Sequence, residues 1–309
     1  MTELPGPVVV VGELLVDIVH VPGGITAEHV GGSPANVALG LARLGHETHF
    51  ATLVGTDDRG ARCAEHVESG GVRLLPGSRS ESHPTSTAVA TLDLTGAASY
   101  VFDLHWDLPP VQLPAGTTHL HIGSIGTTMT PGDAEVTDAV HRARVSGTVS
   151  YDPNVRPTIM GAADEVRPRV EELVARSDVV KCSEDDIAWL YPDRSASDVM
   201  TAWGALGAAL TVVTLGGDGA SWRTASGEEG SAAARTDAVV DTVGAGDSFM
   251  AGLVSGLLDA GLLGGADARE RLRAASLTDV ASSIDRALAT SGVTVRHAGA
   301  YAPTRQEIS

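Results

Sequence analysis

The chain has 309 residues, of which 43% are hydrophobic and 19% charged, so it can bury a substantial core and global disorder is excluded. Its 21 basic and 39 acidic residues give a formal net charge of −18, and Lys181 is the single lysine. A nucleic-acid binder needs a dense basic surface, so this charge balance excludes that class of protein. A P-loop is excluded as well, because its lysine precedes serine or threonine and Lys181 precedes Cys182.

The sequence also predicts a compartment. No stretch of about 18 apolar residues is free of polar interruption, so no transmembrane helix is expected. The residues before Val8 lack the basic region of a signal peptide. Cys63 and Cys182 lie far apart and have no metal-ligand spacing around them, which is typical of a reducing compartment. We therefore expect a cytoplasmic protein with no membrane partner.

Short runs of β-branched residues recur along the chain, separated by segments with helical apolar spacing. The first is Val8–Val11, a continuous valine run that suits a strand buried on both faces. Further strands of this kind are predicted at 49–54, 118–122, 148–151, 179–180 and 210–215. This order predicts an α/β fold with a mostly parallel, doubly wound sheet flanked by helices. No linker composition divides the chain, so 1–309 is expected to be one domain.

Three other segments alternate polar and apolar residues, as antiparallel strands do. They are 17–21, 85–93 and 98–104, with Thr95 and Gly96 placed to turn the last two into a hairpin. They form either a small separate sheet that serves as a lid, with strands inserted at about 13–24 and 84–106, or an antiparallel edge of the main sheet. Alternation alone favours neither arrangement.

The first well-marked helix start is Gly-Gly-Ser-Pro-Ala-Asn at 31–36. Ser33 is predicted as the N-cap, with Pro34 at the first helical position. Gly45 is expected to take the left-handed conformation just after the helix ends. The buried stripe is expected at Val37, Ala38, Leu41 and Leu44. Asn36 then lies in the first turn beside two glycines that allow a ligand to approach the backbone. A surface amide without a ligand is the alternative.

The second helix start is the string Asp-Thr-Val-Gly-Ala-Gly-Asp-Ser-Phe at 241–249. The spacing after it predicts one apolar face made of Phe249, Met250, Leu253, Val254, Leu257 and Leu258. Gly244, Ala245 and Gly246 allow backbone N–H groups to converge at the positive helix end, which makes an anion site without a lysine. Asp247 would repel an anion there unless it accepts a proton. The alternative is an ordinary first-turn carboxylate.

These two segments resemble the two signatures of the PfkB-type sugar kinases, which have the ribokinase-like fold. The resemblance covers nearly the whole chain, because Asp-Pro-Asn-Val-Arg at 152–156 and Thr-Leu-Gly-Gly-Asp-Gly-Ala at 214–220 follow in the family's order. The fructokinase branch is the most similar. The resemblance implies a small β-sheet lid over the sugar, which also joins two copies into a homodimer.

The resemblance also implies a role for each matching residue of the phosphoryl-transfer site. Asp247 would be the general base that takes the proton of the sugar hydroxyl. The backbone amides of Gly244, Ala245, Gly246 and Asp247 would hold the charge that develops on the phosphoryl oxygens. The sugar would be bound by Asp17, Gly31, Gly32 and Asn36, with Phe102 as an apolar contact.

Nucleotide and metal ligands follow from the same resemblance. The nucleotide is expected along Ser183, Thr214, Gly216, Gly217 and Gly219. The family often carries Asn-x-x-Glu near the phosphates and magnesium, whereas Ser183 and Asp186 occupy those positions here. We keep Asp186 as a water-mediated Mg²⁺ contact, against the alternative of a solvated acidic helix start. Asp241 and the Val243 carbonyl match part of a K⁺ site whose other ligands are expected around 294–299.

Two further features have a structural role as the alternative to a functional one. Arg156 would contact substrate or phosphate, or would form a salt bridge to a neighbouring helix. His119 and His121 point to one face of an apolar strand and have no third ligand nearby in sequence, so we expect them to be structural.

These features predict an ATP-dependent sugar kinase that transfers the γ-phosphate to a hydroxymethyl group, with fructose as the favoured acceptor. Alternatives within the family are 2-keto-3-deoxygluconate kinase, ribokinase and nucleoside kinase. A phosphorylated sugar is disfavoured because no basic cluster is evident, and a non-catalytic sensor because base and glycine site are both present. A Rossmann dehydrogenase is excluded, because Gly12-Glu13-Leu14 replaces Gly-x-Gly-x-x-Gly after the first strand.

Overall fold

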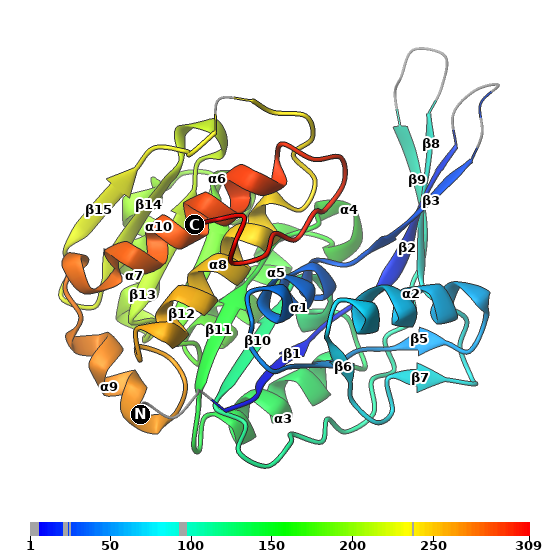
Figure 1. The fold of residues 1–309 in the computed structure, drawn as a ribbon, viewed down its shortest axis with the longest axis horizontal. Helices are drawn as coiled ribbons and strands as arrows, with labels where there is room; N and C mark the ends of the chain where they lie inside the picture. The colour runs from blue at the N-terminus through cyan, green and yellow to red at the C-terminus, as the bar shows by residue number, and fades with distance from the viewer. Residues whose placement is uncertain (1–5, 21–23, 25, 93–97, 237) are drawn as a thin grey trace.

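A computed structural model describes residues 6–20, 24, 26–92, 98–236 and 238–309. Within these ranges no helix has the length and apolar character needed to cross a membrane. The described residues form an α/β structure with one large sheet, helices on both of its faces and a smaller sheet that projects from one side (Figure 1).

The large sheet has nine strands in the order β15-β14-β13-β12-β11-β10-β1-β4-β6. Their bounds are β1 Val8–Val11, β4 Thr48–Ala51, β6 Arg73–Leu74, β10 His119–Gly123, β11 Thr148–Asp152, β12 Val179–Ser183, β13 Leu210–Thr214, β14 Ala220–Thr224 and β15 Glu229–Ala232. All neighbours pair in parallel except β13 with β14 and β14 with β15. The mostly parallel sheet that was predicted is therefore confirmed, with an antiparallel edge.

Strand β1 shows why the valine run belongs in such a sheet. Val8 and Val10 pack into the core on one face, and Val9 and Val11 pack into the core on the other. One predicted strand is wrong in its extent: the segment 49–54 divides into β4 and a separate strand β5, Val54–Gly55, which pairs with β7, Arg79–Ser80.

Two layers of helices cover the sheet. One face carries α1 Ser33–Arg43, α8 Ala245–Asp259 and α10 Leu277–Thr294, while α2 Asp58–Ser69 extends this core beneath the small sheet. The other face carries α3 Asp133–Ala143, α5 Ala163–Val174, α6 Glu184–Leu190 and α7 Ala196–Leu206. The short helix α4, Pro157–Met160, follows β11, and α9, Ala266–Ala274, precedes α10.

Helix α8 differs from its sequence-based prediction. An apolar stripe on one face was expected, but every residue from Asp247 to Leu258 is buried. The reason is that α8 lies between α1 and α10 on top of the sheet. Small residues allow this: a Cβ on Gly256 would lie 2.6 Å from the Ser283 Cα of α10.

The small sheet has four strands in the order β3-β2-β8-β9, with bounds β2 Leu15–His20, β3 Ala27–Gly31, β8 Thr87–Leu92 and β9 Ala98–Asp103. Strands β8 and β9 are antiparallel, as the alternation predicts, and they belong to this separate sheet rather than to an edge of the large one. The expected turn at Thr95 and Gly96 lies outside the described residues. We call this sheet the lid.

Candidate active site

The first turns of α1 and α8 meet at Asp247. Its Oδ1 accepts a hydrogen bond from Ser33 Oγ at 2.7 Å, and its Oδ2 accepts one from Asn36 Nδ2 at 2.8 Å. The side chain is buried in the first turn of α8. Two segments more than 200 residues apart in sequence therefore fix both oxygens of one carboxylate.

The predicted N-cap of α1 is wrong by one position. Gly32, at φ 116°, is the N-cap, and the helix begins at Ser33 with Pro34 in its first turn. The Ser33 hydroxyl does not cap its own helix but donates to Asp247. The predicted helix end is confirmed, because Gly45 has φ 89°.

The loop before α8 requires glycine at its cap. Gly244 is in the left-handed conformation at φ 74°, and a Cβ there would lie 2.6 Å from the Ala300 Cβ. The Ala245 N–H donates to the Thr242 carbonyl at 3.2 Å. Within the described part of the chain, the backbone N–H groups of Gly244, Gly246 and Asp247 have no partner, so of the four predicted amides only that of Ala245 is already used. Free amides at the positive end of a helix can donate hydrogen bonds to an anion.

The glycine pair at 31 and 32 allows the lid strands to lie close to the start of α1. A Cβ on Gly31 would lie 2.1 Å from Asp17 Oδ2, and one on Gly32 would lie 2.4 Å from the Glu13 carbonyl oxygen. Glycine at 31 thus leaves room for the Asp17 carboxylate against the end of β3. Asp17 itself is exposed on β2.

The lid register places Phe102 and Asp17 on the same face. Asp17 pairs with His29 on one side and with Ala88 on the other, and Ala88 pairs with Phe102. Directly paired residues point to the same side of a sheet. The opposite face carries Val16 and Ile18, which are buried in the core. Phe102 therefore lies on the open, Asp17-bearing face, which alternation alone could not decide.

The predicted nucleotide glycines share a groove with the second helix start. Thr214, Gly216, Gly217 and Gly219 line one wall, and Thr242, Ala245 and Gly246 line another. Two of these glycines have positive φ, 54° at Gly216 and 100° at Gly219. The same groove is also lined by apolar side chains, among them Val239, Phe249, Leu288 and Val295. The start of α8 and these apolar side chains therefore line one groove.

A family model described as the pfkB family carbohydrate kinase matches residues 7–307. The chain belongs to the PfkB family of carbohydrate kinases. It is 32% identical over 275 residues to a fructokinase of Klebsiella pneumoniae, covering 83% of this chain and 86% of the relative. It is 30% identical over 255 residues to an aminoimidazole riboside kinase of Salmonella typhimurium, covering 79% of each chain. It is an ATP-dependent carbohydrate kinase.

Solved structures agree with this assignment. A fructokinase with bound ATP from Xylella fastidiosa superposes with a TM-score of 0.87 at 24% identity, covering 99% of this chain and 97% of that one. A fructokinase double mutant from Vibrio cholerae, in a form with fructose, ADP and potassium, superposes with a TM-score of 0.81 at 26% identity, covering 100% and 98%. The ribokinase-like fold is thereby confirmed for this kinase.

Ser183 and Asp186 cap the first turn of α6 with reciprocal hydrogen bonds. Asp186 Oδ2 accepts from Ser183 N and Oγ, both at 2.7 Å, and its Oδ1 accepts from Val155 N at 2.7 Å. Asp186 is buried, so it is not a solvated helix start. Ser183 pairs with Thr214 across β12 and β13, beside the nucleotide groove.

Asp241 and Val243 lie beside the segment 294–299, as the sequence suggests. Asp241 Oδ1 accepts from Val243 N at 3.0 Å and Oδ2 from Gly299 N at 2.8 Å. The backbone N–H of Gly299 is the first cause that holds the pKa of Asp241 below its usual value, and that of Val243 adds to it. A carboxylate kept ionised among backbone groups suits a cation. Within the described ranges no cluster of three acidic, histidine or cysteine side chains has metal-binding geometry.

Arg156 forms no ion pair with a neighbouring helix within the described chain. Its Nη1 donates to the carbonyls of Asn154 and Val155 at 3.0 and 2.9 Å, and to Asn154 Oδ1 at 2.8 Å. The salt-bridge alternative is therefore wrong. The guanidinium lies close enough to Asp17 and Glu13 for its positive charge to favour their ionised forms.

His119 and His121 are fully buried and hydrogen-bonded to the neighbouring strand β11. His119 contacts Thr148 Oγ1 and Ser150 Oγ at 2.9 Å each, and His121 Nδ1 contacts Ser150 Oγ at 3.0 Å. Burial lowers the pKa of both imidazoles to about 3, so both are neutral. These contacts are those of structural residues.

Sequence reasoning missed an ion pair beside the first turn of α8. Lys181 Nζ, in the middle of β12, donates to Asp152 Oδ2 of β11 at 2.9 Å, and both side chains are almost fully buried. The available signal was the placement of the single lysine of a strongly acidic chain two residues before Ser183.

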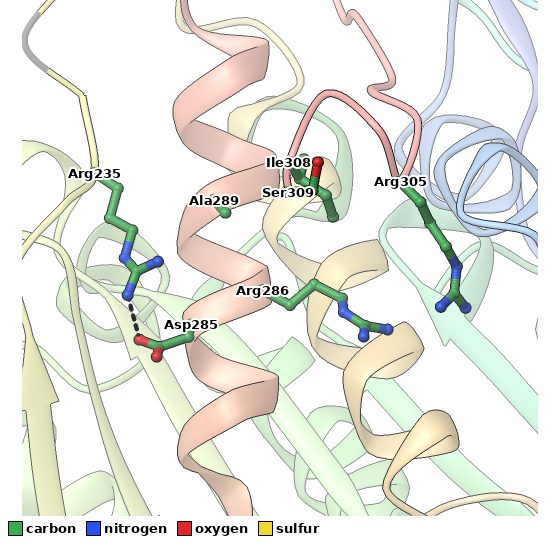
Figure 2. A pocket seen from close by; sticks show the side chains of 7 residues that line it. All are labelled: Arg235, Asp285, Arg286, Ala289, Arg305, Ile308 and Ser309. Atoms are coloured by element: carbon green, nitrogen blue, oxygen red, sulfur yellow. Dashed lines mark hydrogen bonds and ion pairs between the residues drawn. The ribbon is translucent and has the colours of Figure 1, made fainter.

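A second hollow lies along α10, away from the helix starts (Figure 2). It contains arginines, but each guanidinium already pairs with an aspartate: Arg235 with Asp285 at 2.8 Å, and Arg286 and Arg305 with Asp259 at 2.6 Å each. Two aspartates therefore pair with the three guanidinium groups that line this hollow.

Proposed function

We propose that this kinase transfers the γ-phosphate of ATP to a hydroxymethyl group of fructose, with Asp247 as the general base. The observation that carries the proposal is the position of Asp247, buried between two helix starts beside the free amides of Gly246 and itself. The fructokinases among the relatives support fructose as the acceptor.

The proposed chemistry follows from this geometry. The sugar hydroxyl gives its proton to Asp247 as its oxygen forms a bond to the γ-phosphorus, and the bond from that phosphorus to the bridging oxygen of ADP breaks. The amides of Gly246 and Asp247, with the positive end of α8, stabilise the charge on the transferred oxygens. Ser33 and Asn36 keep the carboxylate aimed at the acceptor.

The proposed sugar site lies between the lid and the start of α1. Asp17 and Asn36 offer an acceptor and an amide to the hydroxyl groups, Gly31 and Gly32 allow close approach, and Phe102 covers the sugar from the lid. Arg156 lies at the same side and is proposed to contact the substrate. Closure of the lid would exclude water that competes as a phosphoryl acceptor.

We propose cation sites on two further features. Asp186 would hold Mg²⁺ through water near the phosphates, because its buried carboxylate lies next to Ser183 at the end of the nucleotide groove. Asp241 and the Val243 carbonyl would hold K⁺ with groups of the 294–299 segment. A cation there would neutralise negative charge near the first turn of α8, and the potassium-bound fructokinase supports this proposal.

The lid is also proposed to pair two copies of the chain. Strand β9 is an edge of the lid sheet, and its Tyr100 and Val101 are 57% and 67% exposed. Exposed apolar residues on a strand edge favour pairing with a second strand. Light scattering should give a dimer mass, and Val101→Glu should give a monomer. A monomeric wild type with full activity would contradict this part of the proposal.

The acceptor is tested by a coupled ADP-release assay over fructose, 2-keto-3-deoxygluconate, ribose, adenosine, aminoimidazole riboside and fructose 6-phosphate, each with and without potassium. We expect the highest kcat/KM with fructose and stimulation by potassium. A higher value with aminoimidazole riboside would favour the second candidate, which the relative of that name supports. No turnover with any acceptor would favour a non-catalytic sensor.

A further inference from the structure

The single lysine of this chain is buried in an unusual place. Lys181 lies in the middle of β12, on the sheet face that α8 covers, and its side chain is 3% exposed. Burying an ammonium is costly unless it is paired, and its partner Asp152 is itself 0% exposed. A buried ion pair is weak evidence for stability, because apolar residues of similar volume often stabilise as well or better. The pair therefore calls for a functional explanation.

The ammonium lies against the first turn of α8. A Cβ built on Gly246 would lie 3.1 Å from Lys181 Nζ, so the glycine leaves room for the ammonium beside the helix start. Gly246 and Asp247 are among the described residues whose N–H groups have no partner at this helix start. Lys181 thus stands behind the position at which an anion would bind.

The titratable groups that face Lys181 come from each element packed against it: Asp152 of β11, Asp186 of α6, Asp247 of α8 and His121 of β10. Burial opposes the charged form of Lys181, but Asp152 first, and then Asp186 and Asp247, raise its pKa above the usual value. His121 is neutral, and the adjacent Cys182 thiol has a raised pKa because it is buried. Lys181 is therefore the one cationic side chain among the described groups facing this point.

We propose that Lys181 is a positioning residue of the phosphoryl-transfer site: its ammonium, held by Asp152 against Gly246, supplies fixed positive charge behind the amides that receive the transferred phosphoryl group. This proposal rests on the assignment of those amides above. Charge on the equatorial oxygens must be stabilised as the bond to ADP breaks, and a preorganised charge in a buried site does so without reorganisation. Asp152 keeps the lysine from pairing directly with Asp247, the group that must accept a proton.

The test compares Lys181→Met, which keeps the length and removes the charge, with Lys181→Arg, which keeps the charge. We expect Lys181→Met to lower kcat about 100-fold with KM for ATP within about threefold, and Lys181→Arg to recover part of the loss. Calorimetry supplies a readout that a structural role would not move. Aluminium fluoride, a charged mimic of the phosphoryl group, should tighten ADP binding in the wild type but not in Lys181→Met, while ADP alone binds both equally.

The matched control is Arg269→Met, which breaks the ion pair to buried Asp178, the residue directly before β12. It should lower the melting temperature and leave kcat unchanged. If Lys181→Met keeps the wild-type kcat, or weakens ADP and ADP with aluminium fluoride equally, the proposal is overturned. The calorimetric test also separates it from the choice of acceptor, since it needs no turnover.

A second variant keeps the proposal testable if Lys181→Met does not fold. Asp152→Asn retains a hydrogen-bond acceptor but removes the largest charge that raises the pKa of Lys181. Because activity needs the ammonium, the alkaline limb of the kcat/KM profile should move to lower pH. The same profile as the wild type would overturn the proposal.

Discussion

Asn36 donates a hydrogen bond to Asp247 at 2.8 Å, although the two residues lie 211 positions apart in sequence. The contact joins the first turn of α1 to the first turn of α8 and thereby links the two most distinctive segments of the chain. With Ser33 on the other oxygen, it leaves the Asp247 carboxylate with no freedom to rotate. The proposed activity depends on this fixed carboxylate beside free amides.

Ser33→Ala removes one of the two donors to Asp247. A hydrogen bond to a charged group contributes about 1.5–3 kcal/mol, so we expect kcat to fall at least about tenfold, with the KM values for sugar and ATP little changed. Steady-state kinetics check this. Ser69→Ala, an exposed serine at the end of α2, is the matched control and should behave as the wild type. An unchanged kcat in Ser33→Ala would show that the serine does not orient the base.

Gly31→Ala tests the sugar-binding role of Asp17. The new Cβ would lie 2.1 Å from Asp17 Oδ2, so the carboxylate must move while the chain still folds. We expect KM for the sugar to rise about tenfold and KM for ATP to stay the same. Gly204→Ala in α7, where a Cβ meets no atom within 4 Å, is the control. Equal increases in both KM values would contradict the assignment.

Gly244→Ala strains the loop that presents the amides. The backbone is at φ 74° and the Cβ would lie 2.6 Å from the Ala300 Cβ, so we expect a loss of about 1–3 kcal/mol in unfolding free energy together with a large fall in kcat. Gly116→Ala has similar backbone strain at φ 78° but open space around it. This control should lose stability and keep kcat, as denaturant titration and kinetics will show. A fall in kcat in both variants would point to general destabilisation.

Much of this site could be predicted from the sequence because local chemistry marks it. The valine run at Val8–Val11 can be buried on both faces only in a covered sheet, and the glycines before Asp247 have no use in an ordinary helix start. The residues missed depend on contacts between distant segments. Ser33 looks like an N-cap until α8 supplies a buried acceptor, and Lys181 looks isolated until β11 and Gly246 are placed beside it.

The buried histidines should make the free energy of unfolding depend on pH. Burial lowers the pKa of His46 to about 4, and that of His119 and His121 to about 3, from 6.5. The unfolded chain therefore binds more protons between about pH 4 and 6.5, so unfolding free energy falls as pH drops through this window. At pH 5 each histidine contributes a loss of about 2 kcal/mol. Denaturant unfolding at pH 7.5 and at pH 5 measures this loss of unfolding free energy.

His46→Gln should make this pH dependence shallower, because it removes one of the buried imidazoles and leaves an amide for the Ser255 hydroxyl. A stability that is constant or rises on acidification to pH 5 would contradict the neutral, buried state of these rings.

The most direct measurement is kcat of Asp247→Asn with ATP and the acceptor that the wild type uses best. The substitution keeps the size of the side chain and removes the proton acceptor, so we predict a fall of about 10²–10⁴-fold with an unchanged melting temperature. Asp267→Asn is the matched control, because Asp267 is an exposed carboxylate in the first turn of α9. It should retain full activity. A folded Asp247→Asn enzyme with kcat within about threefold of the wild type would contradict the central claim that Asp247 is the base.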